Sequence, residues 1–197
     1  MTLAPLIIVS GPSGSGKSTL IRETVAQARL PLRLAVSATT RDPRPGEVDG
    51  VDYHFWTPEQ FRQRLAEGAF LEHAQVHGKH YYGTPRSEVD GYRERGIGVI
   101  LDIDVQGAAL VRPLFPDHLS LFVSLSDPET YARRLRLRGA DSEETIARRM
   151  ETAARELARV GEYQYIILND DLRLAVVQFL DLIERHRNHP PGDDDAR

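Results

Sequence analysis

The 197-residue chain contains no cysteine, and this absence removes several classes of protein from consideration. Without thiols there is no disulfide scaffold, no cysteine nucleophile and no thiolate metal site. Long hydrophobic runs are also missing: runs such as residues 6–9 and 99–101 fall far short of the roughly 20 apolar residues that span a bilayer. No basic segment followed by an apolar stretch and a cleavage site opens the chain, so we expect a cytoplasmic protein without membrane association.

An excess of basic residues is absent as well. The chain has 25 basic and 29 acidic side chains and a formal charge of −4, which argues against a general nucleic-acid binder. Lysine is scarce, because Lys17 and Lys79 are the only two lysines among the basic residues and all the others are arginines. A lysine retained against this preference indicates a position that needs a compact ammonium group, and Lys17 is the candidate.

Hydrophobic residues make up 41% of the chain, which is enough to bury a core, and the length suits one α/β domain over residues 1–197. Apolar strands alternate with helices, and this order predicts a mainly parallel sheet flanked by helices. Residues 37–88 interrupt the alternation with short strands and predict an excursion from the core. The expected strands are 6–9, 32–38, 51–56, 70–76, 81–84, 97–103, 119–125 and 165–168. The expected helices are 17–28, one from 57, one ending near 95, one from 127, one from 142, and 172–187.

A phosphate-binding loop lies between the first expected strand and the first expected helix, where its mechanism requires it. Its residues are Gly11, Pro12, Ser13, Gly14, Ser15, Gly16, Lys17 and Ser18. Glycines allow the backbone to curl so that successive N–H groups point at a phosphate, and the following helix adds its positive end. Lys17 can reach the β- and γ-phosphates, and the Ser18 hydroxyl can bind Mg²⁺. The loop predicts a nucleoside triphosphate ligand without saying what reaction follows.

A second set of motifs lies in residues 37–53, 70–74, 81–84, 100–107 and 169–171, together with arginines at 134, 138 and 149. In this unbroken order, the motifs resemble those of the guanylate kinase family, and the resemblance extends from the first strand to about residue 184. It implies a P-loop NTPase-type sheet with an inserted mixed GMP-binding subdomain and a helical lid. The implied activity is transfer of the γ-phosphoryl group of MgATP to GMP, with dGMP as a further candidate acceptor.

The resemblance also divides the chain. The core is expected at about 1–36, 96–125 and 151–188, the GMP-binding arm at about 37–90, the lid at about 126–150, and a tail at 189–197. Partners are expected to be the small molecules ATP and GMP, with no nucleic acid and no membrane.

Two arginines on a proline-stiffened loop are suited to a monophosphate. Arg41 and Arg44 are forked cations that could bind it bidentately, with Glu47 orienting them. The resemblance adds the hydroxyls of Tyr53 and Tyr82. Residues 77–80 make this stretch one residue longer than the family spacing, which leaves Tyr81 as the alternative to Tyr82.

Glu72 is the candidate for base selection because it interrupts an apolar strand, and burying an unpaired carboxylate is costly. The resemblance implies that Glu72 accepts hydrogen bonds from guanine N1–H and the 2-amino group, while Ser37 and Thr84 bind O6. Adenine would present a lone pair at N1 instead, and such sites reject the wrong partner by roughly 10⁴-fold or more. The alternative is a strand residue that faces solvent.

Two carboxylates end the strand at 97–103. Asp102 and Asp104 resemble the acidic strand end that supports Mg²⁺ in phosphate-loop enzymes, with Asp102 acting through water. The resemblance implies that one of the two supports the water shell of the metal and the other approaches the acceptor nucleotide, and it does not say which does which. A plain turn at the strand end is the alternative.

Four arginines occur in the expected helix after residue 127. Arg134 and Arg138 lie one turn apart and share a face, whereas Arg133 and Arg136 lie elsewhere on the helix. The resemblance places this pair in the lid, with Arg149 arriving from the next helix, and a solvated basic face is the alternative. The remaining candidates for the ATP site are Thr19, Asn169 and Asp170; the last two are expected near the adenine.

Other functions remain open at this point. A related phosphate-loop kinase, such as a ribose bisphosphate kinase, would share the loop but not the GMP motifs. A guanylate-kinase-like interaction module that has lost catalysis would typically carry a degraded phosphate loop. A GTPase would carry an Asn-Lys-x-Asp motif, which the sequence lacks.

Overall fold

The fold is taken from a computed structural model of the chain and is described for residues 3–76, 79–137 and 142–188. The first half comprises β1 (Leu6–Ser10), α1 (Lys17–Gln27), β2 (Leu32–Leu34), β3 (Ala38–Thr39), β4 (His54–Phe55), α2 (Pro58–Ala66), β5 (Phe70–Val76), β6 (His80–Pro85) and α3 (Asp90–Glu94). The second half comprises β7 (Gly98–Asp102), α4 (Val105–Val111), β8 (Leu119–Ser124), α5 (Pro128–Leu137), α6 (Glu143–Leu157), β9 (Tyr165–Leu168) and α7 (Leu172–Asn188). Short 3₁₀ turns occupy Arg86–Glu88, Arg112–Leu114 and Val160–Glu162. Among these helices, none combines the length and the apolar character that crossing a bilayer requires.

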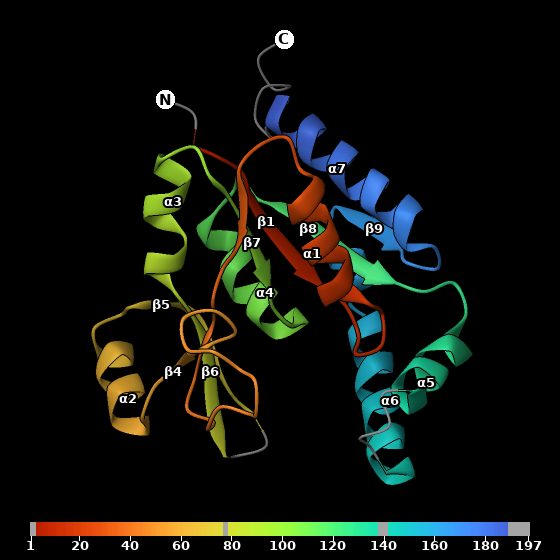
Figure 1. Cartoon of the computed structure of the whole chain (residues 1–197), viewed down its shortest axis with the longest axis horizontal. Coiled ribbons are helices and arrows are strands. Elements are labelled where there is room, and N and C mark those ends of the chain that lie inside the picture. Colours follow the sequence, from red (N-terminus) through yellow and green to blue (C-terminus); the bar gives the residue numbers. More distant parts are fainter. Residues whose placement is uncertain (1–2, 77–78, 138–141, 189–197) are drawn as a thin grey trace.

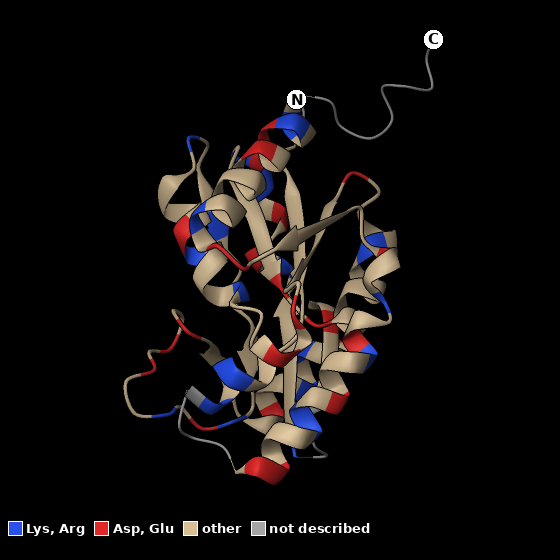
Figure 2. Ribbon diagram, turned by 90° about the vertical axis from the view of Figure 1, so that its right-hand side faces the viewer, with Lys and Arg blue, Asp and Glu red and all other residues tan. Residues whose placement is uncertain are grey.

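The core is a five-stranded parallel sheet in the order β2-β7-β1-β8-β9 (Figure 1). Helices α1 and α7 pack on one face, where Phe179 and Ile21 join Ile7 and Val9 in the core. Helix α4 packs on the opposite face together with α3. The strands carry little charge along their length, and most charged residues lie on helices and loops (Figure 2). The predicted mainly parallel sheet flanked by helices is confirmed.

A second, four-stranded mixed sheet in the order β4-β3-β6-β5 forms the excursion, and we call it the arm sheet. Helix α2 covers one of its faces through a cluster of Phe61, Phe70 and Ala38, with Trp56 and Tyr81 at its edge. The start of α2 follows the sequence pattern, because Thr57 and Gln60 bond reciprocally to each other's backbone N–H groups. The opposite face of the arm sheet is therefore left free of α2.

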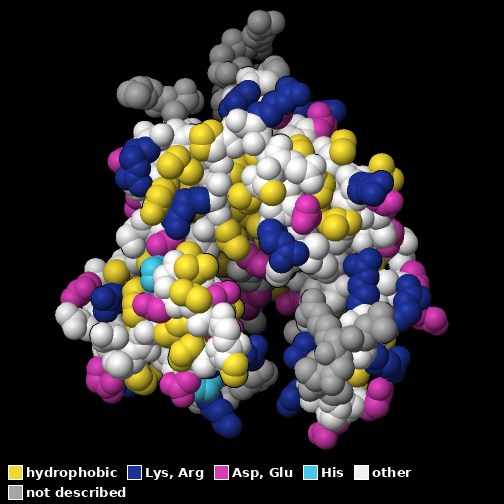
Figure 3. Space-filling view, viewed as in Figure 1, with side chains coloured by type: hydrophobic (Ala, Val, Ile, Leu, Met, Phe, Trp, Pro, Cys, Tyr) yellow, Lys and Arg dark blue, Asp and Glu magenta, His cyan; other side chains and the backbone are white. Residues whose placement is uncertain are grey.

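Helices α5 and α6 form a pair at the lower right of Figure 1, across from the arm sheet at the lower left. Helix α6 begins at the Ser142 cap, as the sequence predicted, because the hydroxyl of Ser142 accepts a hydrogen bond from the N–H of Thr145. The space-filling view shows the molecule hollowed between the arm sheet and this pair, below the core (Figure 3). The carboxyl ends of β1 and β7 open toward this hollow (Figure 1).

Two expected strands are wrong in extent. The apolar run 32–38 is not one strand: β2 ends at Leu34 in the core sheet, and β3 begins at Ala38 in the arm sheet. The expected strand 51–56 shrinks to His54–Phe55, because the N–H groups of Val51 and Asp52 bond back to the carbonyl of Val48 in a turn. The first error arises where the chain passes from the core to the arm, and the second lies within the arm, between β3 and β4.

A buried carboxylate holds this passage together. Glu88 accepts hydrogen bonds from the backbone N–H of Val36 at 3.0 Å and from Arg33 at 2.6 Å. His54 Nε2 lies 3.1 Å from its other oxygen. Burial by itself would raise the pKa of Glu88, but the hydrogen bonds from Val36, His54 and Arg33 outweigh it and lower this pKa. One side chain thus joins β2 of the core, the segment leaving it, and β4 of the arm.

The lowered pKa of Glu88 predicts a pH dependence of stability. A carboxyl group with a folded-state pKa below its unfolded value stabilises the fold above the unfolded pKa, and this contribution disappears as the pH falls through the folded value. We expect Glu88→Gln to lower the free energy of unfolding by about 1–3 kcal/mol at pH 7. We also expect the difference from wild type to shrink below about pH 4.5. Urea unfolding at pH 7, 5 and 3.5 measures this, and a difference independent of pH would contradict the role of the charge.

Candidate active site

The phosphate-binding loop joins β1 to α1, and its conformation requires glycine at two positions. A Cβ atom at Gly11 would collide with the carbonyl oxygen of Val123 on β8. Gly16 has a φ of +83°, and a Cβ atom there would lie 2.5 Å from Nδ2 of Asn169. Larger residues at these positions would therefore move the loop away from the sheet.

Two side chains from distant segments hold the same backbone oxygen of the loop. The carbonyl of Ser15 accepts hydrogen bonds from Asn169 Nδ2 at 2.8 Å and from Arg134 at 3.2 Å. Arg134 also donates to the carbonyl of Asn169 at 3.0 Å. Asn169 is only 4% exposed, and its Oδ1 is buried without a partner in the described part of the chain. Sequence reasoning assigned Arg134 and Asn169 to ATP but did not predict this support of the loop.

Lys17 lies at the start of α1 and forms an ion pair with Asp102 at the end of β7. Ser18 Oγ is 3.5 Å from the other oxygen of Asp102. Burial lowers the pKa of Lys17 to about 8, against the opposing effects of the Glu156 and Asp104 carboxylates. This lysine therefore lies among carboxylates in a site that is partly shielded from solvent.

These residues line a cavity of about 320 Å³. Its lining includes most of the predicted loop residues and both predicted aspartates: Gly11, Pro12, Ser13, Gly14, Gly16, Lys17, Ser18, Thr19, Asp102, Asp104 and, unexpectedly, Glu156. Burial and Asp104 raise the pKa of Glu156. The sequence did contain a signal for Glu156. On α6 it lies beside the apolar stripe that includes Ala153 and Leu157, and this position predicts a side chain that faces the core.

Mg²⁺ is the metal that a phosphate loop implies, and the residues present fit it. Ser18 and Asp102 offer a hydroxyl and a carboxylate side by side, and hard oxygen ligands of this kind suit Mg²⁺. Mg²⁺ normally keeps several waters and binds through one or two protein groups plus phosphate oxygens. Asp104, in contrast, has an additional structural role, since its side chain caps α4 by accepting the N–H groups of Gln106 and Gly107.

The register of the arm sheet brings the predicted base-contacting residues together. Glu72 on β5 pairs with Thr84 on β6. On the other edge of β6, Ala38 pairs with Gly83, so the antiparallel register places Ser37 opposite Thr84. Cross-strand partners share a face of the sheet, so Glu72, Thr84 and Ser37 lie on the face that α2 leaves free, whereas Ala38 and Gly83 lie on the face that α2 covers. Thr84 is 1% exposed and donates a hydrogen bond to Glu72 Oε1 at 2.7 Å. Burial raises the pKa of Glu72, and the Asp104 carboxylate adds to this effect.

The same register distinguishes the two adjacent tyrosines. Tyr82 pairs with Ala74, two positions along from Glu72, and therefore shares its face. Its ring makes an edge contact with Tyr53 at 6.0 Å between centroids. Tyr81 points to the opposite face, where it stacks on Phe61 under α2 at 5.5 Å. The structure thus groups Tyr82, rather than Tyr81, with Glu72 and Tyr53.

The predicted arginine loop is preorganised by Glu47. Arg41 forms a bidentate pair with Glu47, with N···O distances of 2.8 and 2.9 Å. The backbone N–H of Arg44 donates to the same carboxylate at 2.7 Å. The hydrogen bond from Arg41 lowers the pKa of Glu47 to about 2, and hydrogen bonding to Glu47 and to Tyr82 raises the pKa of Arg41. Tyr53 lies beneath the Arg41 guanidinium, 5.4 Å from ring centroid to carbon.

The remaining predicted residues lie near the loop or outside the described part of the chain. Arg149 on α6 lies 3.5 Å from the hydroxyl of Ser13. Asp170 accepts a hydrogen bond from the N–H of Ser126, where the chain enters α5. Arg138 and the tail at 189–197 lie outside the described residues.

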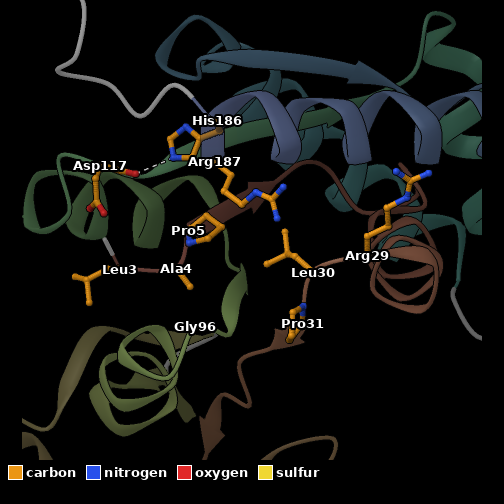
Figure 4. Close-up of a pocket in the computed structure, with 10 residues that line it drawn as sticks. All are labelled: Leu3, Ala4, Pro5, Arg29, Leu30, Pro31, Gly96, Asp117, His186 and Arg187. Carbon is orange, nitrogen blue, oxygen red and sulfur yellow. Dashed lines mark hydrogen bonds between the residues drawn. The ribbon is translucent and has the colours of Figure 1, made fainter. Parts of the chain in front are cut away.

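A larger cavity of about 520 Å³ lies at the opposite end of the core sheet (Figure 4). It is lined by Leu3, Ala4, Pro5, Arg29, Leu30, Pro31, Gly96, Asp117, His186 and Arg187. His186 bonds to the carbonyl of Asp117 at 2.9 Å. This cavity contains no residue of the phosphate loop or of the arm sheet. The candidate active site is therefore identified by the residues that line it and not by the volume of its cavity.

Comparison with known proteins agrees with this geometry. The family model described as guanylate kinase matches residues 4–186. A guanylate kinase of Alkalilimnicola ehrlichii is 47% identical over 184 residues, covering 92% of this chain and 90% of that protein. A guanylate kinase of Fusobacterium nucleatum subsp. nucleatum is 42% identical over 184 residues, with coverages of 93% and 98%. The crystal structure of guanylate kinase from Anaplasma phagocytophilum matches with a TM-score of 0.77 and 26% identity over 98% of this chain and 93% of that chain.

The family match extends over nearly the whole chain, in the same order as the motifs and on the same fold. The chain belongs to the guanylate kinase family.

Proposed function

We propose that the protein transfers the γ-phosphoryl group of MgATP to GMP, giving ADP and GDP. The observation that carries this proposal is Glu72: a partly buried carboxylate with a raised pKa, on the same face of the arm sheet as Tyr82 and beside Thr84. In the described part of the chain, Thr84 alone donates hydrogen bonds to this carboxylate, so it is prepared for a ligand that supplies more donors. Guanine supplies two adjacent donors, N1–H and the 2-amino group.

The base is selected by this arrangement of donors and acceptors. Glu72 accepts from N1–H and the 2-amino group, and the hydroxyls of Ser37 and Thr84 donate to O6. AMP would bring the lone pair of adenine N1 against the carboxylate, leaving buried polar groups without partners. Sites of this kind discriminate by roughly 10⁴-fold or more.

The phosphate of GMP is bound by the arginine loop. Arg41 and Arg44 supply the cations, and Glu47 keeps them in place by its bonds to both residues. The hydroxyls of Tyr53 and Tyr82 donate to the same phosphate from the free face of the arm sheet. Arginine binds phosphate oxygens bidentately, so this group fixes the direction in which the acceptor oxygen points.

ATP is bound by residues 11–19, through the backbone N–H groups of all of them except Pro12, and by the ammonium group of Lys17. Arg134 and Arg149, from the α5–α6 pair, surround the triphosphate together with Arg138, and Asn169 and Asp170 lie near the adenine. Ser18, and Asp102 through water, hold the Mg²⁺ that accompanies ATP. When bound, the metal neutralises charge on the β- and γ-phosphates.

Lys17 changes partner when ATP binds. Its ammonium group now pairs with Asp102, and the triphosphate offers it oxygens of higher negative charge. The exchange leaves Asp102 available for the water shell of Mg²⁺ and places a cation at the transferred phosphoryl group. No covalent intermediate is needed, because alignment of the two nucleotides can contribute about 7–11 kcal/mol to lowering the barrier.

The arm and the lid close as the two nucleotides bind. The hollow between the arm sheet and the α5–α6 pair is open in this structure, so water would reach the γ-phosphate (Figure 3). Closure excludes water and brings the arginines of the α5–α6 pair to the charge that develops during transfer. Without closure the enzyme would hydrolyse ATP.

A coupled assay that detects ADP tests the activity. We expect turnover with MgATP and GMP, and a specificity constant for AMP lower by about 10⁴-fold or more, because adenine cannot donate hydrogen bonds to Glu72. Omission of Mg²⁺ should abolish turnover. Equal rates with both acceptors, or no turnover with GMP, would reject the proposal.

The variant Glu72→Gln should separate binding from stability. At pH 7 the ionised carboxylate destabilises the fold, because its folded-state pKa lies above the unfolded value. The glutamine side chain retains an oxygen for Thr84 but loses the charge and presents an amide to guanine. We expect GMP affinity to fall by at least about tenfold, with unchanged ATP affinity and a melting temperature no lower than wild type. Calorimetry with each nucleotide measures this; a fall in ATP affinity alone would contradict the assignment.

The two tyrosines provide a matched pair of variants. We expect Tyr82→Phe to raise the KM for GMP by about three- to tenfold, because a phosphate contact of about 1 kcal/mol is lost. Tyr81→Phe removes a hydroxyl from the α2 side of the sheet and should leave this KM unchanged. Steady-state kinetics on both variants gives the comparison, and the reverse pattern would identify Tyr81 as the phosphate ligand.

A further inference from the structure

Gly107 of helix α4 lies against the carboxylate of Glu72. A Cβ atom built on Gly107 would lie 3.1 Å from Glu72 Oε2, 3.3 Å from its Cδ and 3.4 Å from its Cγ. Gly107 is buried, and no atom of another side chain lies as close to this point. The other carboxylate oxygen, Oε1, accepts the hydrogen bond from Thr84 on β6. The carboxylate is therefore confined between α4 on one side and β6 on the other.

The backbone at Gly107 does not itself need glycine. This residue is inside α4 and is not among the glycines with positive φ. Its N–H donates to the capping Asp104, as any residue other than proline could do. Because glycine is a poorer helix former than alanine, its presence inside a buried helix has a conformational cost. The space beside Glu72 is the feature that an alanine would remove.

We propose that Gly107 is a specificity-determining residue for the guanine base. The absence of a side chain at this position lets the Glu72 carboxylate lie against α4, in the orientation from which both oxygens can meet the edge of guanine. A methyl group there moves Oε2 and Cδ away from α4 and rotates the carboxylate relative to the base. Gly107 acts through Glu72 and is a positioning residue. This inference rests on the proposed function, since it assigns Glu72 to guanine.

The test is Gly107→Ala, with nucleotide binding measured by calorimetry on the full chain. We expect GMP affinity to fall about tenfold or more, because small displacements of a hydrogen-bonding group are costly in a buried site. ATP affinity should stay within twofold of wild type, which also verifies the fold. The melting temperature should equal or exceed that of wild type, because alanine favours the helix.

Gly91→Ala is the matched control. Gly91 also lies in a helix, α3, and a Cβ atom there would meet only the flexible end of Arg95, at 3.3 Å. This variant should bind GMP as wild type does. A loss of GMP affinity in Gly91→Ala as large as in Gly107→Ala would show a general effect of helix substitution and overturn the proposal.

A double-mutant cycle identifies the route of the effect. In a Glu72→Ala background, Gly107→Ala should cause no further loss of GMP affinity, because the group that it displaces is gone. Equal losses in both backgrounds would overturn the role of Gly107 toward Glu72. Wild-type protein that fails to bind GMP would reject the proposed function itself. Wild type that binds GMP, with Gly107→Ala binding it equally well, would reject only the role of Gly107.

Discussion

The candidate site depends on a partly buried carboxylate that is paired with no cation in the described part of the chain. Glu72 and Glu88 are both glutamates of the arm region, but their surroundings differ. Glu88 is bonded to Arg33 and to a backbone N–H, and its pKa is lowered. Glu72 accepts a hydrogen bond from Thr84, has no arginine or lysine paired with it among the described residues, and has a raised pKa. Glu88 therefore stabilises the fold, whereas Glu72 can accept further hydrogen bonds, which in the proposed function come from the guanine base.

Much of the fold could be predicted because its signals are local. The alternation of strands and helices, the Thr57 cap box and the Ser142 cap depend on residues a few positions apart, and the structure contains all of them. The error at residues 32–38 has a non-local cause. An apolar run does not reveal where a chain leaves one sheet for another, and the break is held by Glu88, which lies 52 residues after Val36. The information that ends β2 is thus outside the segment itself.

The candidate site also has some features that local sequence signals predict and others that depend on distant residues. The phosphate loop and the pair of Arg41 with Glu47 lie within short stretches, so residue types and spacing were sufficient to predict them. The support of the Ser15 carbonyl comes from residues 119 and 154 positions away, and no spacing rule predicts it. The choice between Tyr81 and Tyr82 required the register of β5 and β6, because a shift of one residue exchanges the two faces of a strand.

In both regions proposed to bind phosphate, a cation is paired with a carboxylate before any nucleotide binds. Lys17 is paired with Asp102, and Arg41 is paired with Glu47. Each phosphate must compete for its cation with the carboxylate already paired to it, or share the cation with that carboxylate. The free energy of binding is therefore less favourable than it would be with an unpaired cation. In return, the cations are already oriented, and less conformational entropy is lost on binding. Because the products ADP and GDP are also highly charged, this moderation of phosphate binding favours their release after transfer.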